Sequence, residues 1–284
     1  MTPLLIAVTI ETHPYDWCGV AAQSAWPGAW AVIAALLMAA AYGAAVLRWG
    51  RGERRPRIAL FATGLAVWIA ALSGPLEALA LNRLYSAYIL QQFLIVMVVC
   101  PALVAGLAPW MLRPIVSVSL LRRFFGLVTR PGVAFTVFAC VFAGVHLPSF
   151  CNLVCQVHPF YHAVRITLFV AGLLLWWPVL GPAPEFPRLS QPMQGIYLLG
   201  VMLVMTAVGA PVTLAETVLY HFYAGGTHPL GLTPLQDQVL GGLLMWVAQG
   251  IVLTAVATVI FVRWLGATPG SVPATAPYAG RTRT

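Results

Sequence analysis

Seven long apolar stretches limit what this chain can fold into more than any other feature of its sequence. They cover residues 29–47, 58–80, 86–108, 133–147, 160–180, 193–215 and 238–264. A helix needs about 20 mostly apolar residues to cross roughly 30 Å of hydrocarbon. In lipid every backbone polar group must be paired within the protein, which these lengths allow only as helices. The sequence therefore predicts an all-α fold, a polytopic membrane helix bundle of about seven transmembrane helices.

The composition excludes a soluble globular domain. Hydrophobic residues make up 61% of the chain and charged residues only 8%, whereas a soluble domain carries about 25% charged residues. No nucleotide-binding loop, nucleophile elbow or HExxH pattern is present, and these are the local sequences that would indicate common enzyme chemistry. We therefore do not expect an enzyme.

The arginines determine which way the predicted bundle faces. Every basic residue is arginine, and thirteen of the fifteen fall on one side once the seven stretches cross a membrane in turn. These thirteen are Arg48, Arg51, Arg54, Arg55, Arg57, Arg113, Arg122, Arg123, Arg130, Arg188, Arg263, Arg281 and Arg283. Loops rich in basic residues stay in the cytoplasm. The N-terminus is therefore expected outside and the C-terminus in the cytoplasm.

This orientation divides the chain into three regions. Residues 1–28 form an exported N-terminal segment, residues 29–265 a seven-helix transmembrane domain, and residues 266–284 a cytoplasmic tail. The tail is rich in Pro, Ala, Gly and Thr, a composition typical of disorder. The net charge of +8 follows from topology and from contact with anionic lipid headgroups. It does not require nucleic acid as a partner.

Potential metal ligands collect on the predicted exported side. They are His13, His146, His158, His162, His221 and His228, joined by Cys18, Cys151 and Cys155. Imidazole and thiolate are ligands that copper prefers, so the clustering suggests metal handling. The alternative is that these side chains lie there only because that side of the membrane interface is polar.

The densest of these groups runs from residue 146 to residue 169, HLPSFCNLVCQVHPFYHAVRITLF. Cys151 and Cys155 are four residues apart, as are His158 and His162, and on a helix each pair would share one face. A shared face is what a bidentate metal site needs. In the alternative interpretation the histidines cap a helix start and the cysteines fill small apolar spaces. Cys18 outside the membrane could instead form a disulfide with Cys151 or Cys155.

Polar residues within the apolar stretches cost free energy, so each one needs an explanation. Glu77 is expected to pair with Arg83 or Arg165, or to reach interfacial water. The glutamines Gln91 and Gln92 are interpreted as interhelical hydrogen-bonding groups rather than ligands.

Asp237, next to Gln238, is expected to complement the dipole of the last membrane helix. Trp176 and Trp177 are interpreted as an interfacial aromatic belt.

Three segments in order give the chain a specific resemblance. They read SGPLEALALNRLYSAYILQQFLIVMVVCPALVAGLAP, HLPSFCNLVCQVHPFYHAVRITLFVAGLLLWWPVLGPAP and GLTPLQDQVLGGLLMWVAQG. Over residues 30–265 the chain resembles the seven-helix integral-membrane CtaG family of cytochrome c oxidase assembly factors. The resemblance implies a multi-pass protein of the bacterial cell (inner) membrane whose partners are terminal oxidase subunits and the lipid bilayer. It also implies help with copper delivery at the outer face, which makes copper the possible cofactor.

The chain departs from the family pattern at four positions. Where the family reads AHMxQHLLL, this chain reads AYILQQFLI, so Tyr88 and Gln92 replace two histidines. Where the family reads HALEHLLF, this chain reads HAVRITLF, so His162 remains while Arg165 and Ile166 replace Glu and His. A guanidinium there would repel a metal ion by a few kcal/mol at an effective dielectric near 20.

Two interpretations of these departures remain open. Arg165 is either a structural replacement, paired with Glu77 or bonded to Tyr88, or it stands beside a weak metal site retained by His146 and His162. Cys151 or Cys155 could add ligands to such a site. The alternatives to an assembly factor are an accessory structural subunit of a respiratory complex and, less favoured, a small-solute transporter.

Overall fold

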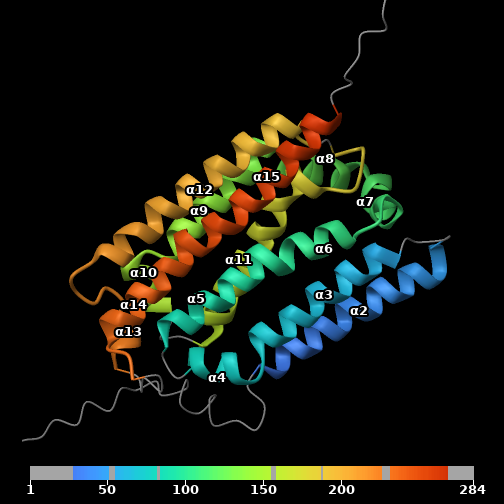
Figure 1. Ribbon diagram of the computed structural model, residues 1–284. Coiled ribbons are helices and arrows are strands. Elements are labelled where there is room, and N and C mark those ends of the chain that lie inside the picture. Colours follow the sequence, from blue (N-terminus) through green and yellow to red (C-terminus); the bar gives the residue numbers. More distant parts are fainter. Residues whose placement is uncertain are drawn as a thin grey trace, which may run out of the picture.

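The computed structural model of the protein describes residues 28–50, 55–81, 84–154, 158–186, 188–225 and 231–267. Within these ranges the chain is helical and contains no strand. Long helices run alongside one another as an elongated bundle (Figure 1). This confirms the predicted all-α membrane fold. Most of the predicted exported segment and nearly all of the predicted tail lie outside the described residues.

Six described helices are long and apolar enough to span a membrane, and there are seven if one bent pair is counted as a span. The α-helices are α2 (Ala29–Trp49), α3 (Arg55–Leu72), α4 (Pro75–Leu81), α5 (Tyr85–Leu94), α6 (Cys100–Gly106), α7 (Arg113–Ser117), α8 (Ser119–Val128), α9 (Pro131–Val145), α10 (Pro148–Val154), α11 (His158–Leu180), α12 (Gln191–Leu214), α13 (His221–Ala224), α14 (Pro234–Leu243) and α15 (Gln249–Ala267). The bent pair is α8 with α9. About seven spans were expected, so the number of spans is confirmed.

The second predicted stretch, residues 58–80, is broken in the structure. Helix α3 ends at Leu72 and α4 begins at Pro75. Gly74 between them has a φ of 71°, a left-handed conformation that glycine adopts without strain. Pro75 cannot donate a backbone hydrogen bond to the preceding turn and suits a first helical position. The break starts α4 as a separate helix, and α4 contributes Glu77 to the interior.

Two spans contain a π-helical segment. Helices α5 and α6 join through Ile95–Val99, and α14 and α15 join through Leu244–Ala248. The Cys100 N–H donates to the carbonyl of Ile95, five residues earlier. Pro101 follows directly and lacks a backbone donor of its own, so the regular helical bonding of the span is interrupted by a π segment just before the proline.

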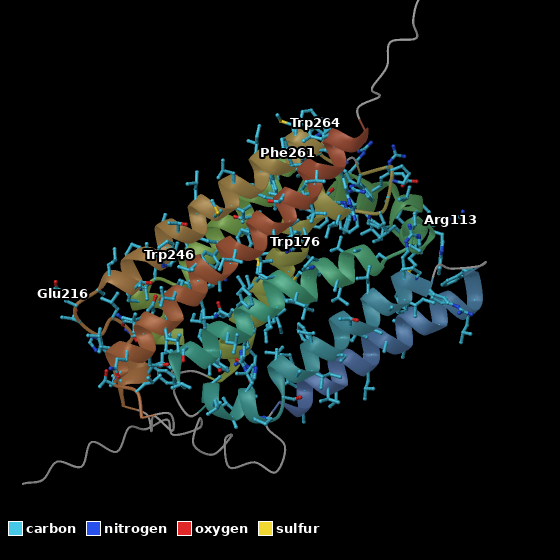
Figure 2. The ribbon with its side chains drawn as sticks, in the orientation of Figure 1. Arg113, Trp176, Glu216, Trp246, Phe261 and Trp264 are labelled. Carbon is cyan, nitrogen blue, oxygen red and sulfur yellow. The ribbon has the colours of Figure 1, made fainter. Side chains whose placement is uncertain are left out.

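The core lies around the spans 85–106 and 161–180. In their apolar windows 61% and 56% of residues are buried, against 17% in Ala29–Trp49, which marks them as the central helices. Trp176 joins these two spans, because its Nε1–H donates to the Val96 carbonyl at 2.7 Å. Its side chain is only 1% exposed, so the expected aromatic belt is wrong for this residue. Figure 2 shows Trp176 between Glu216 and Arg113, which lie at opposite ends of the bundle.

Candidate functional site

A buried polar network joins α4, α5 and α11 inside the bundle. Nη1 of Arg165 lies 2.8 Å from Oε1 of Glu77, and both side chains are 1% exposed. The amide of Gln91 bridges the pair, since its Nε2 donates to Oε2 of Glu77 at 2.7 Å and its oxygen accepts from Arg165. Nε2 of Gln91 also donates to the Ala71 carbonyl in α3. The expected Glu77–Arg165 pair is confirmed, as is interhelical bonding by Gln91.

Aromatic rings enclose the guanidinium of Arg165. Its Nη2 donates to the hydroxyl of Tyr161 at 2.6 Å. Its central carbon lies 4.2 Å from the ring centroid of Tyr161 and 5.9 Å from that of Tyr88. A cation near the face of an aromatic ring is stabilised by the ring quadrupole. Arg165 therefore makes a cation–π contact with Tyr88.

The network has electrostatic consequences for any metal ion. Arginine keeps its proton in proteins, so Arg165 brings a permanent positive charge to this point. One carboxylate balances it, and both charges are almost fully removed from solvent. A divalent cation placed beside Arg165 would be repelled by that charge, and the carboxylate that could attract the cation is already bonded to Arg165 and Gln91. The arrangement suits a structural clamp between three helices.

Tyrosines extend the network towards α13. The rings of Tyr85 and Tyr220 stack with centroids 4.3 Å apart. Tyr223 lies 5.3 Å from Tyr85 and 5.7 Å from Tyr88. Sequence reasoning missed Tyr161, Tyr220 and Tyr223. Only Tyr161 had a usable signal, because it precedes Arg165 by four residues and so shares its helix face.

Asp237 and Gln238 bind neighbouring elements of the bundle. Asp237 lies in the first turn of α14, as expected, but its carboxylate accepts from the backbone N–H groups of Tyr85 at 2.6 Å and Ser86 at 3.0 Å. It therefore caps α5 rather than only its own helix. Oε1 of Gln238 accepts from the N–H of Leu219 at 2.7 Å, and its Nε2 donates to the Thr217 carbonyl at 3.2 Å.

His146 lies just past the end of α9 and is 4% exposed. Its Nδ1 is 2.7 Å from the carbonyl oxygen of Phe142, which assigns the proton to Nδ1 because a carbonyl only accepts. Its Nε2 is buried and has no hydrogen-bond partner among the described residues. Burial lowers the pKa of His146 to about 4, so the ring is neutral near pH 7.

The other predicted metal ligands are only partly covered by the structure. His162 packs against Trp30, with ring centroids 5.1 Å apart. Cys151 in α10 is 4% exposed. His158 begins α11, but its side chain and the whole of Cys155 lie outside the described residues. Where residues are described, no three His, Cys, Asp or Glu side chains group closely enough to hold a metal ion. A metal site made of His146, His158, His162, Cys151 and Cys155 stays a prediction.

The positions where family ligands are replaced do not share one environment. Tyr88, Gln92 and Arg165 are 2%, 3% and 1% exposed, whereas Ile166 is 51% exposed. Both amide atoms of Gln92 are buried and have no hydrogen-bond partner in the described part of the chain, so the interhelical bonding expected of Gln92 is not seen there. Tyr88 and Arg165 meet in the network, and Ile166 lies outside it.

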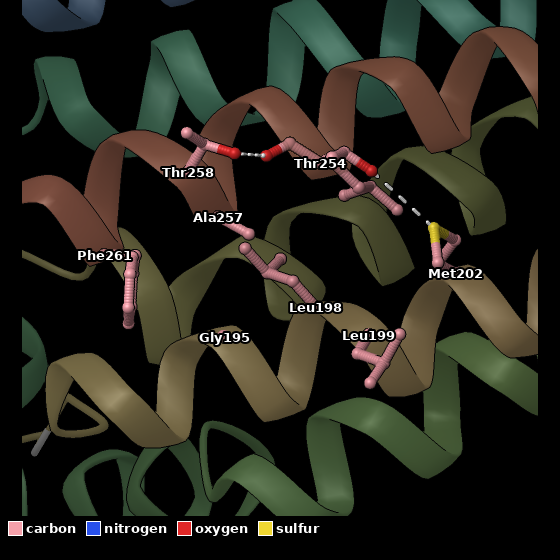
Figure 3. Close-up of a pocket in the computed structure, with 9 residues that line it drawn as sticks. Gly195, Leu198, Leu199, Met202, Thr254, Ala257, Thr258 and Phe261 are labelled. Atoms are coloured by element: carbon pink, nitrogen blue, oxygen red, sulfur yellow. Dashed lines mark hydrogen bonds between the residues drawn. The ribbon is translucent and has the colours of Figure 1, made fainter.

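A hollow lies between α12 and α15, away from the polar network (Figure 3). It has a volume of about 440 Å³ and is lined by apolar side chains together with Thr254 and Thr258. Both hydroxyls are used locally, since Thr258 donates to the Thr254 carbonyl at 2.8 Å and Thr254 to Sδ of Met202 at 3.9 Å. The residues that line the hollow include no charged group, so it gives no support to a polar transport path.

Comparison with known families gives one match. The family model described as cytochrome c oxidase caa3 assembly factor (Caa3_CtaG) matches residues 40–267, a range that contains the whole polar network. No curated protein and no solved structure matches the chain.

Proposed function

The chain belongs to the family of cytochrome c oxidase caa3 assembly factors, and we propose that it assists the maturation of a haem-copper oxidase as a non-enzymatic membrane scaffold. Its partners are the oxidase subunits and the lipid bilayer, with no role for nucleic acid. It acts in the bacterial inner membrane with its N-terminus outside and its C-terminus in the cytoplasm. The distribution of arginines supports this orientation.

One observation carries the scaffold role. The buried pair of Arg165 and Glu77, bridged by Gln91, occupies the region where the family pattern places His and Glu side chains. A fixed guanidinium repels metal ions, and its hydrogen bonds to groups on two other helices hold the bundle in one arrangement. A rigid bundle without a metal in its centre can bind an oxidase subunit during assembly.

Deleting the gene tests this function. Assembled oxidase in isolated membranes is measured by haem spectrum, copper content and oxygen uptake, with and without added copper. A scaffold predicts a loss of assembled oxidase that copper does not restore. Oxidase subunits that are made normally but fail to assemble would support the same conclusion. Unchanged oxidase after deletion would contradict it.

Copper handling at the outer face is the second candidate. His146 supports it, because a neutral imidazole with a buried and unpartnered Nε2 is the form of histidine that binds metals. His158, His162, Cys151 and Cys155 would complete the ligand set. Purified protein would then bind Cu(I) stoichiometrically, and the double variant His146→Ala, His162→Ala would lose the metal. Restoration of oxidase by added copper in the deletion strain would favour this candidate over the scaffold.

An accessory subunit of the mature complex is the remaining alternative. It differs from an assembly factor in the lifetime of the complex. A tagged chain that co-purifies with fully active oxidase in fixed stoichiometry would favour the subunit. A chain that co-purifies only with incomplete oxidase would favour the assembly factor.

A further inference from the structure

Helix α8 (Ser119–Val128) carries an apolar stripe that the rest of the described chain does not cover. Leu120, Phe124 and Leu127 are 74%, 62% and 50% exposed. Their spacing of four and three residues places them on one side of the helix. No residue of α8 is buried. Large apolar side chains of this kind are not left in contact with water, so either lipid or another protein covers the stripe.

Two arginines accompany the apolar stripe on α8. At 100° per residue Arg122 lies about 160° around the helix from Phe124, whereas Arg123 lies about 60° from Leu120, at the flank of the stripe. Both arginines are exposed, and the first turn of α8 contains no acidic residue. Within the described ranges neither arginine forms an ion pair with a carboxylate. The helix thus carries one arginine opposite its apolar stripe and one at the edge of the stripe, a combination found in helices that lie in a membrane surface.

The connection to α9 limits how far α8 can lie from the membrane. The two helices meet at an angle of 66°, with only Thr129 and Arg130 between them. Helix α9 has 15 residues, which is about 22 Å of helix and less than the roughly 30 Å of hydrocarbon in a bilayer. The start of α9 therefore lies at or within the boundary of the hydrocarbon, and this keeps α8, which is separated from α9 by two residues, next to the bilayer.

Aromatic contacts hold one edge of α8 against the bundle. The ring of Phe125 lies 5.0 Å from that of Trp177 and 5.1 Å from that of Phe186. Figure 1 shows α8 beside α7 at one end of the bundle. With Phe125 fixed inward, the stripe of Leu120, Phe124 and Leu127 remains turned away from the protein.

We propose that α8 is an in-plane helix that binds an anionic phospholipid surface. The stripe of Leu120, Phe124 and Leu127 enters the acyl region, while Arg122 and Arg123 bind lipid phosphates. Lipid is the occupant rather than a protein because the short α9 keeps α8 next to the bilayer and because the two positive charges match an anionic surface. Each arginine near such a surface raises the ratio of lipid-bound to unbound α8 roughly fivefold.

Hydrogen–deuterium exchange of the full chain in nanodiscs tests the proposal. The probes are discs of phosphatidylcholine alone and discs that also contain phosphatidylglycerol. We expect the backbone amides of residues 119–128 to exchange at least about tenfold more slowly in the anionic discs than in the neutral discs. The double variant Arg122→Gln, Arg123→Gln should lose this difference. Arg263→Gln, which removes an exposed charge from α15, is the matched control and should keep it.

A second variant tests the apolar stripe without disturbing the core. Phe124→Ser removes an exposed ring, so the bundle should keep its thermal stability while α8 exchanges faster in both kinds of disc. Equal exchange of α8 in neutral and anionic discs for the native chain would overturn the proposal. Protection of α8 only after addition of purified oxidase would also overturn it, and would assign the stripe to a protein partner.

Discussion

Arg165 is the residue on which the interior of the bundle depends most. Its guanidinium bonds to Glu77, Gln91 and Tyr161, so one side chain joins α4, α5 and α11. A buried charge is tolerated only while its partner is present. Substitution of either partner should therefore do more damage than substitution of both.

A double-mutant cycle tests this dependence. Glu77→Gln leaves the charge of Arg165 uncompensated and should lower the free energy of unfolding by about 3–5 kcal/mol. The double variant Glu77→Gln, Arg165→Met removes both charges and should be more stable than Glu77→Gln alone. Thermal unfolding in detergent micelles compares these variants with Arg165→Met alone. Additive losses in the double variant would show that the two side chains are not coupled.

The buried imidazole of His146 predicts a dependence on pH. Its pKa is about 4 in the folded protein, against an ordinary value of 6.5. The unfolded chain therefore binds the proton more readily, and stability is lost as the pH falls from about 6.5 to 4. The full effect is about 3 kcal/mol. The unfolding temperature is measured against pH across this range in metal-free buffer. Its slope should differ between the native chain and His146→Gln. Parallel curves would contradict the assignment.

At the scale of elements, backbone chemistry explains where the sequence interpretation succeeded and where it did not. The apolar stretches identified the membrane helices because hydrophobic length is a local property. The break at Gly74 and Pro75 is also encoded locally, although residues 58–80 read as one stretch. Capping of α5 by Asp237 was not accessible, because Asp237 and Tyr85 are separated by 152 residues.

Asp237 is expected to stabilise α5 through that cap. Asp237→Ala leaves the N–H groups of Tyr85 and Ser86 without their carboxylate and should cost about 1–2 kcal/mol. Asp237→Asn keeps one amide oxygen as acceptor and should cost less. In Asp237→Ala, the hydrogen-exchange rate of residues 85–90 should rise more than that of the rest of the protein. A uniform rise along the whole chain would mean that Asp237 does not act through α5.

Close packing of α14 on α5 depends on Gly241. A Cβ at this position would lie 2.5 Å from the ring of Tyr85. Gly241→Ala should therefore destabilise the protein by about 1–3 kcal/mol through overpacking. A Cβ at Gly144 in α9 would meet no neighbouring group within 4 Å, so Gly144→Ala is the matched control and should be neutral or slightly stabilising. Equal unfolding temperatures for the two variants would disprove the packing argument.

For the whole molecule, the sequence was sufficient for the fold class but not for the interior. Hydropathy and the three family segments led to a helical bundle and to the family that residues 40–267 match. The pairing of Glu77 with Arg165 was one of several possibilities, because sequence alone cannot say which helices are neighbours. Tyr220 and Tyr223, at α13, came from a part of the chain with no periodic signal. Tertiary contact, not local pattern, placed Tyr223 beside Tyr88.

The orientation of the whole molecule is open to a direct test. The proposed topology puts the C-terminus in the cytoplasm, on the side of the thirteen arginines. A C-terminal green fluorescent protein fusion should therefore fluoresce, and a C-terminal alkaline phosphatase fusion should be inactive. Fusions of both reporters after Glu216 should give the opposite result. An active phosphatase at the C-terminus would reverse the orientation.

The π segment at Ile95–Val99 makes the bundle sensitive to the length of its chain. Such a segment contains one residue more than a regular helix would use over the same rise. Loss of a single residue there would restore a regular helix and leave Tyr88, Gln91 and Cys100 facing as they do now. A one-residue insertion would instead add to the excess and turn one half of the span by about 100° against the other, so that Tyr88 and Gln91 face away from α11. We therefore expect the network to survive a one-residue deletion in this segment and to be lost after a one-residue insertion.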